Sequence, residues 1–472
     1  MNKLREQAAK QGPIKALSTC VILFGLALTW AVIPAESAVE VFTVAAIGVG
    51  VTLLAATVIE GTRGIRTLVR IDLLAFWALY GLTFLEFLFP QPHVNEMVSS
   101  AAALNGTNAA LLGFAGLAIG RYLIPKRAGF RGHLASIDLR PRNVFSLFVV
   151  ATLLGYFHIF LAVNFDAFEV VRQMTLPRFW QSWGRGRYGD AAALLYELGA
   201  VIYLIPPTAG LVFARAQEYS VIQKVIVAIV TAFTFFYGFA SGTRNVFVTY
   251  VIAFVGVYML TKREFSVRQA VLLGVPTLAI LLVGTVYMLE FREAGLSNFS
   301  SKANKSDEFF IDLNIVNVSR LTEVFPHSFE YLGLEIPYNT LIRPIPRVLW
   351  PSKPEGLSVT IETALGAWGG VTLTCTFIGE AYMAGGLFVV LLMSVCFGAA
   401  AELWNRLGSN SSRFTQLLYV SGFLPAAIGM RSMLSIVSFM LPTLALWVYG
   451  KLWLPRSSFQ RFPGTVNRNM HE

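Results

Sequence analysis

A proline-stiffened stretch from Arg343 to Pro354 carries the residues of this chain that are best suited to chemistry. It reads RPIPRVLWPSKP, so two arginines, a lysine and a tryptophan accompany four prolines. Each proline fixes φ, which leaves the neighbouring cations little conformational entropy to lose on binding. A guanidinium group forms paired hydrogen bonds with phosphate oxygens and stays charged, and an indole ring offers a flat face. The stretch therefore predicts recognition of an anionic group joined to a sugar.

Two further arginines follow tight turns between apolar runs. Arg244 comes after Ser241, Gly242 and Thr243, and Arg431 holds the matching position between the last two runs. Glycine lets the backbone approach a ligand, and hydroxyl, amide and guanidinium groups all bind phosphate oxygens. An ordinary glycine turn, or snorkelling of an arginine to lipid phosphates, explains each residue singly. Their joint occurrence favours a diphosphate site formed by Arg244, Arg343, Arg347 and Arg431.

Carboxylates near the ends of apolar runs are the candidates for proton transfer. Glu380 lies just before Gly385-Gly386, where the chain returns to an apolar run, and Glu86 lies late in an earlier run. An ionisable group near the hydrocarbon region is a functional candidate by default. The alternative is that each carboxylate pairs with an arginine, which is the favoured explanation for Glu86.

Aromatic residues near these charges offer flat faces to sugar rings. The candidates are Trp350, Trp368 and Tyr382, whereas Trp180 and Trp183 are better explained as anchors at a membrane interface. His327 is the only histidine of the stretch 291–385, and no group of histidines and carboxylates there has recognisable metal-ligand spacing. The predicted chemistry needs neither a metal nor a cofactor, and a divalent ion on scattered carboxylates stays open as an alternative.

The elements that must position these residues are membrane helices. The chain is 55% hydrophobic and 14% charged, with a mean hydropathy of +0.62, which excludes an ordinary soluble domain. Apolar runs long enough to cross a bilayer recur about twelve times. This predicts an all-α polytopic membrane protein with spans over 16–33, 39–59, 71–89, 109–123, 144–163, 191–214, 225–240, 246–260, 270–289, 386–403, 414–430 and 433–454.

Basic residues orient these spans. With the N-terminus in the cytoplasm, most of the 37 lysines and arginines fall on the cytoplasmic side. Both termini are then cytoplasmic, and residues 291–385 form one large external loop between the nine spans of 1–290 and the three spans of 386–472. The net charge of +10 follows from this topology and from attraction to anionic membrane lipid, so no nucleic acid is needed to explain it.

A family resemblance rests on the proline-rich string and its surroundings. PRVLWPSKP is preceded by His327, Ser328, Tyr331, Gly333 and Tyr338 and followed by Gly379 to Tyr382 and Gly385-Gly386. These residues resemble a motif of the bacterial O-antigen or oligosaccharide repeat-unit polymerase family. The resemblance covers 326–386, and the many-span layout with one large loop agrees with it elsewhere. Gly242 to Arg244 is similar to a Gly-Ser-Arg turn of many members, with threonine in place of serine.

The resemblance implies a C-type glycosyltransferase (GT-C) fold in the bacterial inner membrane. A glycan on undecaprenyl diphosphate would be transferred to a sugar hydroxyl of the next lipid-linked repeat unit on the periplasmic face, which extends an O-antigen or capsule-like polysaccharide. The four arginines would stabilise the leaving diphosphate, with Arg347 acting in catalysis, and Glu380 would take the proton of the acceptor hydroxyl. A protein that regulates chain length is a possible partner.

Two other functions stay open. An O-antigen ligase shares the architecture and the external loop but transfers glycan to a lipid A core, and the Pro-Arg-x-x-Trp-Pro string favours a polymerase. A flippase for lipid-linked glycans needs cations along a cavity through the bilayer midplane, whereas the mid-span positions here are nearly uncharged. The chain has no glycine-rich nucleotide loop, which fits a donor delivered on a lipid carrier.

Overall fold

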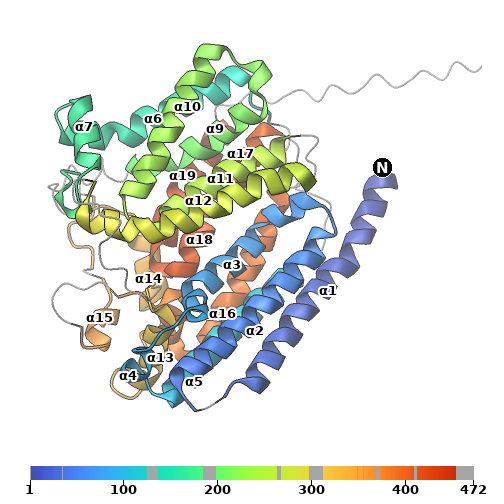
Figure 1. Cartoon of the computed structure of the whole chain (residues 1–472), viewed down its shortest axis with the longest axis vertical. Helices are drawn as coiled ribbons and strands as arrows, with labels where there is room; N and C mark the ends of the chain where they lie inside the picture. Colours follow the sequence, from blue (N-terminus) through green and yellow to red (C-terminus); the bar gives the residue numbers. More distant parts are fainter. Residues whose placement is uncertain are drawn as a thin grey trace, which may run out of the picture.

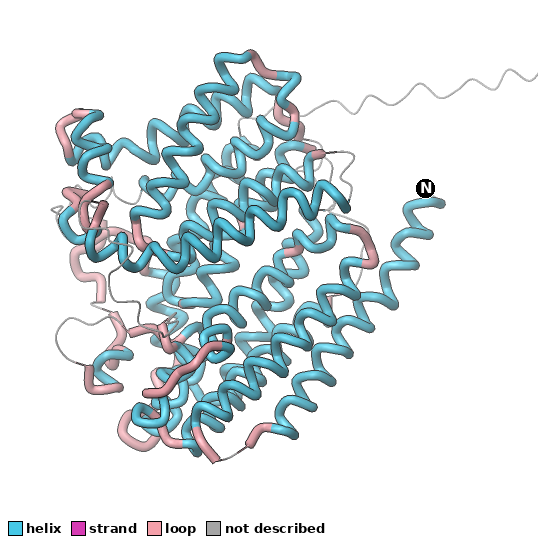
Figure 2. Tube along the Cα trace, viewed as in Figure 1, coloured by secondary structure: helices cyan, strands magenta, loops and turns pink. Residues whose placement is uncertain are grey.

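The computed structural model describes the chain apart from residues 1, 35, 125–136, 184–197, 263–266, 297–311, 348, 355, 368–372, 409–411 and 453–472. Regular structure in the described part is entirely helical (Figure 2). Eight of these helices are long and apolar enough to cross a membrane, and three shorter apolar helices accompany them. The all-α class is thus confirmed, and the long apolar helices agree with a multi-pass membrane protein; a total of twelve spans remains a prediction.

The helices follow one another with short connections over most of the chain (Figure 1). Their bounds are α1 (Asn2–Val32), α2 (Ala38–Gly61), α3 (Ile71–Thr83), α4 (Val94–Met97), α5 (Ser100–Leu123), α6 (Pro141–Ala162), α7 (Ala167–Met174), α9 (Ile205–Ala214), α10 (Val221–Ala240), α11 (Arg244–Thr261), α12 (Val267–Ala294), α13 (Asn314–Val324), α14 (Glu335–Ile342), α15 (Ile361–Ala364), α16 (Thr376–Gly408), α17 (Arg413–Ser421), α18 (Phe423–Arg431) and α19 (Ile436–Leu452). Short 3₁₀ turns include η1 (Ile65–Val69), η2 (Leu85–Leu88), η5 (Gly199–Leu204) and η7 (Met433–Ser435).

Two hydrophobic cores divide the helices into two groups. The first bundle consists of α1, α2, α3, α5, α13 and α16, around residues such as Phe42, Phe76 and Phe114. The second bundle consists of α6, α9, α10, α11, α17 and α19, around residues such as Tyr250 and Phe414. In Figure 1 the blue helices of the first bundle lie in the lower part of the molecule and the green helices of the second bundle in the upper part. Helix α18 joins them, because Phe423 at its start belongs to the second core and Met430 near its end to the first.

Helix α5 is the central helix of the first bundle. A Cβ atom at Gly120 would overlap the backbone of Val395 in α16, and one at Gly398 would overlap the backbone of Leu117. Small residues let membrane helices approach this closely, and van der Waals packing then holds them together. The sequence predicted a span from residue 109, but α5 begins at Ser100, where the Ser99 side chain accepts a hydrogen bond from the Ala102 N–H group. The predicted start was too late because polar residues in the first turns of α5 lower the local hydropathy.

The predicted external loop is partly built into the first bundle. Its described part contains α13, where Ile315, Val318 and Leu321 are buried against that core. The Asn314 amide donates to the Leu82 carbonyl oxygen at 2.9 Å, which ties α13 to α3. The loop boundaries also differ from the prediction, since α12 runs to Ala294 and α16 begins at Thr376. Helix α13 is too short to span a bilayer, but its apolar residues recur on one face and pack against the core of the first bundle.

Helix α16 is broken at Gly385-Gly386. Gly386 has φ +66°, a left-handed conformation that glycine adopts readily. The break frees the carbonyl groups of Met383 and Ala384, which accept hydrogen bonds from the backbone of Leu332 at 2.8 Å and Gly333 at 2.9 Å. The short segment that carries Glu380 is thereby separated from the long apolar part of α16.

Candidate functional site

Five charged side chains gather at one end of the junction between the two bundles. We call Glu86, Arg244, Arg292, Asp312 and Arg431 the Arg244 cluster. Glu86 lies in η2 beyond the end of α3, and Arg244 is the first residue of α11. Arg292 lies in the last turn of α12, Asp312 precedes α13, and Arg431 ends α18. Arg244 interacts electrostatically with the other four, so residues far apart in sequence share one site.

The turn before Arg244 is shaped to place two of these arginines together. Gly242 has φ +62°, and the aliphatic stem of Arg292 packs directly on it, since a Cβ atom at Gly242 would lie 2.6 Å from Cδ of Arg292. The Ser241 hydroxyl accepts a hydrogen bond from the Thr243 N–H group at 3.2 Å. The predicted glycine turn is confirmed, and it positions Arg292 as well as Arg244. Sequence reasoning missed Arg292, although its place at the end of an apolar run was a signal shared with the other two.

The Arg244 cluster is partly buried and partly open to solvent. The Arg431 and Asp312 side chains, 3.4 Å apart, are 31% and 42% exposed. Glu86 is fully buried, and its Oε2 accepts from the Leu313 N–H group at 3.4 Å. The Nε atom of Arg431 is buried and has no hydrogen-bond partner among the described residues. Three arginines beside two carboxylates, partly shielded from solvent, favour binding of an anion.

Glu380 lies next to this cluster and binds the backbone that follows Arg431. It is 3% exposed, and its Oε1 accepts from the Ser432 hydroxyl at 2.6 Å. Its Oε2 accepts from the N–H groups of Met433 at 2.5 Å and Leu434 at 3.2 Å. These N–H groups begin η7, which leads into α19, so Glu380 acts as a helix cap supplied from another helix. Its role as a base remains a prediction. The sequence suggested an arginine as the alternative partner; the hydrogen bonds of Glu380 are to Ser432 and to backbone, and Arg343 interacts with Glu380 electrostatically.

The cations of the proline-rich loop are used largely to close that loop. Arg347 donates from Nη1 to the Lys353 carbonyl oxygen at 3.1 Å and from Nη2 to the Pro354 carbonyl oxygen at 3.3 Å. The Lys353 ammonium group donates to the carbonyl oxygens of Arg343 and Ile345, both at 2.9 Å. Arg347 and Arg343 remain exposed on the outer surface of the loop. Diphosphate binding by either is therefore still a prediction, and loop closure is an additional role for Arg347.

The aromatic candidates have different surroundings. Tyr382 is half-buried and makes an edge-to-face contact with Tyr331, with ring centres 6.3 Å apart. Trp350 is also half-buried and donates from its indole nitrogen to the Ser352 hydroxyl at 2.9 Å. Trp368 lies outside the described residues. Trp180 is 72% exposed, as expected for an interface anchor, but Trp183 is 4% exposed and belongs to the second core, so that expectation was wrong for Trp183.

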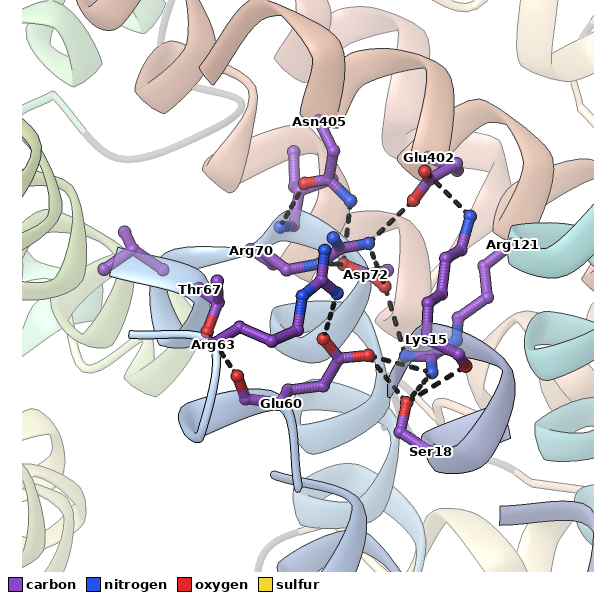
Figure 3. A network of polar contacts seen from close by, with 12 residues as sticks. Lys15, Ser18, Glu60, Arg63, Thr67, Arg70, Asp72, Arg121, Glu402 and Asn405 are labelled. Carbon is purple, nitrogen blue, oxygen red and sulfur yellow. Dashed lines mark hydrogen bonds and ion pairs between the residues drawn. The ribbon is translucent and has the colours of Figure 1, made fainter. Parts of the chain in front are cut away.

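A second set of charges lies at the opposite end of α3 (Figure 3). Four cations and three carboxylates alternate, and we call them the Arg121 network. Neighbouring groups are 2.5 to 3.3 Å apart, in the order Arg63, Glu60, Arg121, Asp72, Arg70, Glu402 and Lys15. The sequence treated these arginines as exposed topology signals, but Arg121 is fully buried and also donates to Ser18 and Thr19 of α1. The network ties α1, α2, α3, α5 and α16 together.

Comparison with known proteins does not add to this picture. Neither a protein-family model, nor a curated protein, nor a solved structure matches the chain. In the part of the chain that the structure describes, histidine, cysteine, aspartate and glutamate side chains do not gather in threes in a way that could hold a metal ion. The described part of the fold is all-α with eight helices long and apolar enough to cross a membrane, and the function has to be inferred from the Arg244 cluster.

Proposed function

We propose that the protein is a membrane glycosyltransferase of the GT-C type that polymerises lipid-linked oligosaccharide repeat units. Its donor is a glycan on undecaprenyl diphosphate, and its acceptor is a sugar hydroxyl of the next repeat unit, at the periplasmic face of the bacterial inner membrane. The observation that carries the proposal is the convergence of Arg244, Arg292 and Arg431 from three helices at a half-buried end of the bundle.

The charge of this site suits a diphosphate leaving group. Negative charge accumulates on the diphosphate as the glycosidic bond breaks, and arginines held in advance stabilise it without reorganisation. Arg292 is held on Gly242, and Arg431 is held by the turn that Glu380 caps. Arg343 interacts electrostatically with Glu380, and we propose that it and Arg347, both exposed on the proline-rich loop, contact the rest of the substrate.

The junction between the two bundles contains a small cavity next to Arg244. A cavity of about 60 Å³ lies between α3, α11 and α18, lined mostly by apolar side chains such as Leu82, Ile252 and Phe423 and by Asn245, the residue after Arg244. The cavity is too small to hold an isoprenoid chain, so the lipid of the proposed donor would lie along the outer surface of the bundles, with its diphosphate at the Arg244 cluster.

The acceptor hydroxyl has two candidate bases. Glu380 is the residue expected from the sequence, and its carboxylate is already occupied by three hydrogen bonds. Asp312 is the more accessible, since it is 42% exposed beside Arg431. A base has to come within hydrogen-bond reach of the hydroxyl, so the two are to be tested side by side.

The test replaces Arg244, Arg292 and Arg431 one at a time by lysine. Lysine keeps the charge but loses the planar fork of donors, so we expect extension of purified lipid-linked repeat units to fall by roughly ten- to a hundredfold. Arg172→Lys is the matched control, because Arg172 is 67% exposed on α7 and pairs with Glu169. Full extension by all three variants would reject the proposal.

Products in a deletion strain separate polymerase from ligase. Loss of a polymerase leaves a core that bears at most one repeat unit. Loss of a ligase leaves a bare core while long glycan accumulates on the lipid carrier. Unaltered glycan length in the deletion strain would exclude a polymerase.

A further inference from the structure

Helix α14 carries apolar side chains on its outer face and polar side chains on its inner face. Five large apolar residues recur at helical spacing along α14 and the turns that flank it, each between 38% and 83% exposed, and we call them the α14 row: Leu334, Tyr338, Leu341, Ile345 and Leu349. On the inner face Asn339 and Thr340 are buried, and each donates a side-chain hydrogen bond to a carbonyl oxygen of α14 itself. A helix that meets water has the reverse distribution, which indicates that the outer face of α14 meets apolar surroundings.

The α14 row begins beside the exposed apolar side of α16. The N–H groups of Leu332 and Gly333 donate to carbonyl oxygens just before the break in α16, at 2.8 and 2.9 Å. The Tyr331 hydroxyl packs on Gly386 at that break, since a Cβ atom at Gly386 would lie 2.8 Å from it. Beyond the break α16 exposes large apolar side chains, which include Leu387, Phe388, Leu392 and Leu403. Helix α16 is long and apolar enough to cross a membrane, and in a bilayer such side chains meet lipid, so α14 starts where this lipid-facing side starts.

The second half of the α14 row is interleaved with cations. Exposed apolar and exposed cationic side chains alternate in the order Leu341, Arg343, Ile345, Arg347 and Leu349. Lipid supplies acyl chains for the one kind of side chain and phosphates for the other. Packed on a second copy of itself, the same surface would place arginine near arginine. The charge pattern therefore favours lipid over a second copy as the occupant.

We propose that α14 and the following turns to Leu349 lie in the membrane surface, with the α14 row at the boundary between acyl chains and headgroups. Amphipathic segments of this kind insert about 5–10 Å into that boundary. The inner face of α14 packs on η7, which directly follows Ser432 and Arg431, and on α16 and α19. Insertion thus attaches the turn after Arg431 to the bilayer. The inference is independent of the proposed function, because it concerns a lipid contact that exists whether or not the protein transfers sugars.

Quenchers placed in the lipid and in the water test this contact. Cys20 and Cys396 are exposed and are first replaced by alanine, while the buried Cys375 is kept. Leu334→Cys and Leu341→Cys, made separately, then carry a bimane dye on purified full-length protein in phosphatidylcholine vesicles. One set of vesicles contains lipid with a spin label near the top of the acyl chain, and a second set receives iodide in the water. Two positions are used so that the result does not depend on one variant.

Two further positions calibrate the quenching. Phe388→Cys is the lipid-facing reference, since Phe388 is 74% exposed on α16, and Glu96→Cys is the water-facing reference, since Glu96 is 79% exposed on α4. We expect spin-labelled lipid to lower the fluorescence of both α14 positions by roughly half, as at Phe388→Cys, while iodide has little effect on them. Quenching by iodide alone would place the α14 row in water, and quenching by neither would mean that protein covers it. Either result overturns the proposal.

Substitution within the α14 row shows whether its apolar character holds it in the lipid. In the Leu334→Cys protein, Leu341→Asp with Ile345→Asp should lower the lipid quenching by roughly twofold or more, because a carboxylate is costly among acyl chains. Leu341→Met with Ile345→Met is the matched control and should preserve the quenching. Lipid quenching that is equal in the aspartate and methionine variants would reject the proposed role of the row.

Discussion

The two ends of α3 carry charged residues of the same types in opposite settings. In the Arg121 network every cation lies within 3.3 Å of a carboxylate, and the side chains are at most 13% exposed. In the Arg244 cluster the Arg431–Asp312 pair is 3.4 Å apart and 31% and 42% exposed. A closed alternating network leaves no room for a ligand, whereas an open group of arginines can exchange its contacts for those of an anion. The difference indicates a structural joint at one end and a binding site at the other.

Arg121→Leu is the change with the largest expected effect. It removes the central cation of the network and leaves Glu60 and Asp72 buried with fewer partners, so we expect the free energy of unfolding to fall by about 3–5 kcal/mol. Thermal unfolding of purified protein, or its yield in the membrane, measures the loss.

The paired experiment at the other end sharpens the comparison. Arg431→Leu removes a half-exposed cation, so its stability cost should be about 1 kcal/mol or less. Equal losses from Arg121→Leu and Arg431→Leu would mean that the two ends do not differ in the way proposed.

Glu380→Gln separates the capping role from catalysis. The amide keeps the shape but places an NH₂ group against donors that now bind a carboxylate, which leaves buried N–H groups unsatisfied at a cost of about 1–3 kcal/mol. We therefore expect a lower unfolding temperature. The rate at which the folded variant extends lipid-linked repeat units then shows whether Glu380 is the base.

The extension assay of Glu380→Gln has two possible outcomes. A fall of about 10²- to 10⁴-fold identifies Glu380 as the base. A near-normal rate assigns the role to Asp312, and Asp312→Asn should then show the loss without a large change in unfolding temperature.

Gly242→Ala adds a single methyl group and alters no charge. The left-handed backbone at residue 242 disfavours alanine by about 1–2 kcal/mol, and the new methyl group would displace the Arg292 stem. We expect weaker substrate binding, seen as a raised KM, with little change in yield. Gly366→Ala is a control, since Gly366 also has a positive φ but has no neighbouring atom near the added carbon. Unchanged KM in Gly242→Ala would show that the Arg292 position is unimportant.

Sequence alone determined the membrane class and much of the helix layout. The predicted span over 39–59 corresponds to α2 at Ala38–Gly61, and the turn before Arg244 lies where glycine and serine placed it. These features depend on local properties, because hydropathy sums the transfer free energies of adjacent residues and a glycine turn is set by a few dihedral angles.

Tertiary structure alone decided which charges meet. In the sequence, Arg121 and the arginines assigned to loops near residues 63–70 look like ordinary topology signals. Only the packing of four other helices around Arg121 shows that it is buried and paired. Likewise, Arg292 lies near Arg244 because its stem packs on Gly242, and Glu380 accepts hydrogen bonds from residues after 430 such as Met433. Burial and pairing of a charge depend on groups that are distant in sequence, and the local sequence does not show which of these groups come close in the fold.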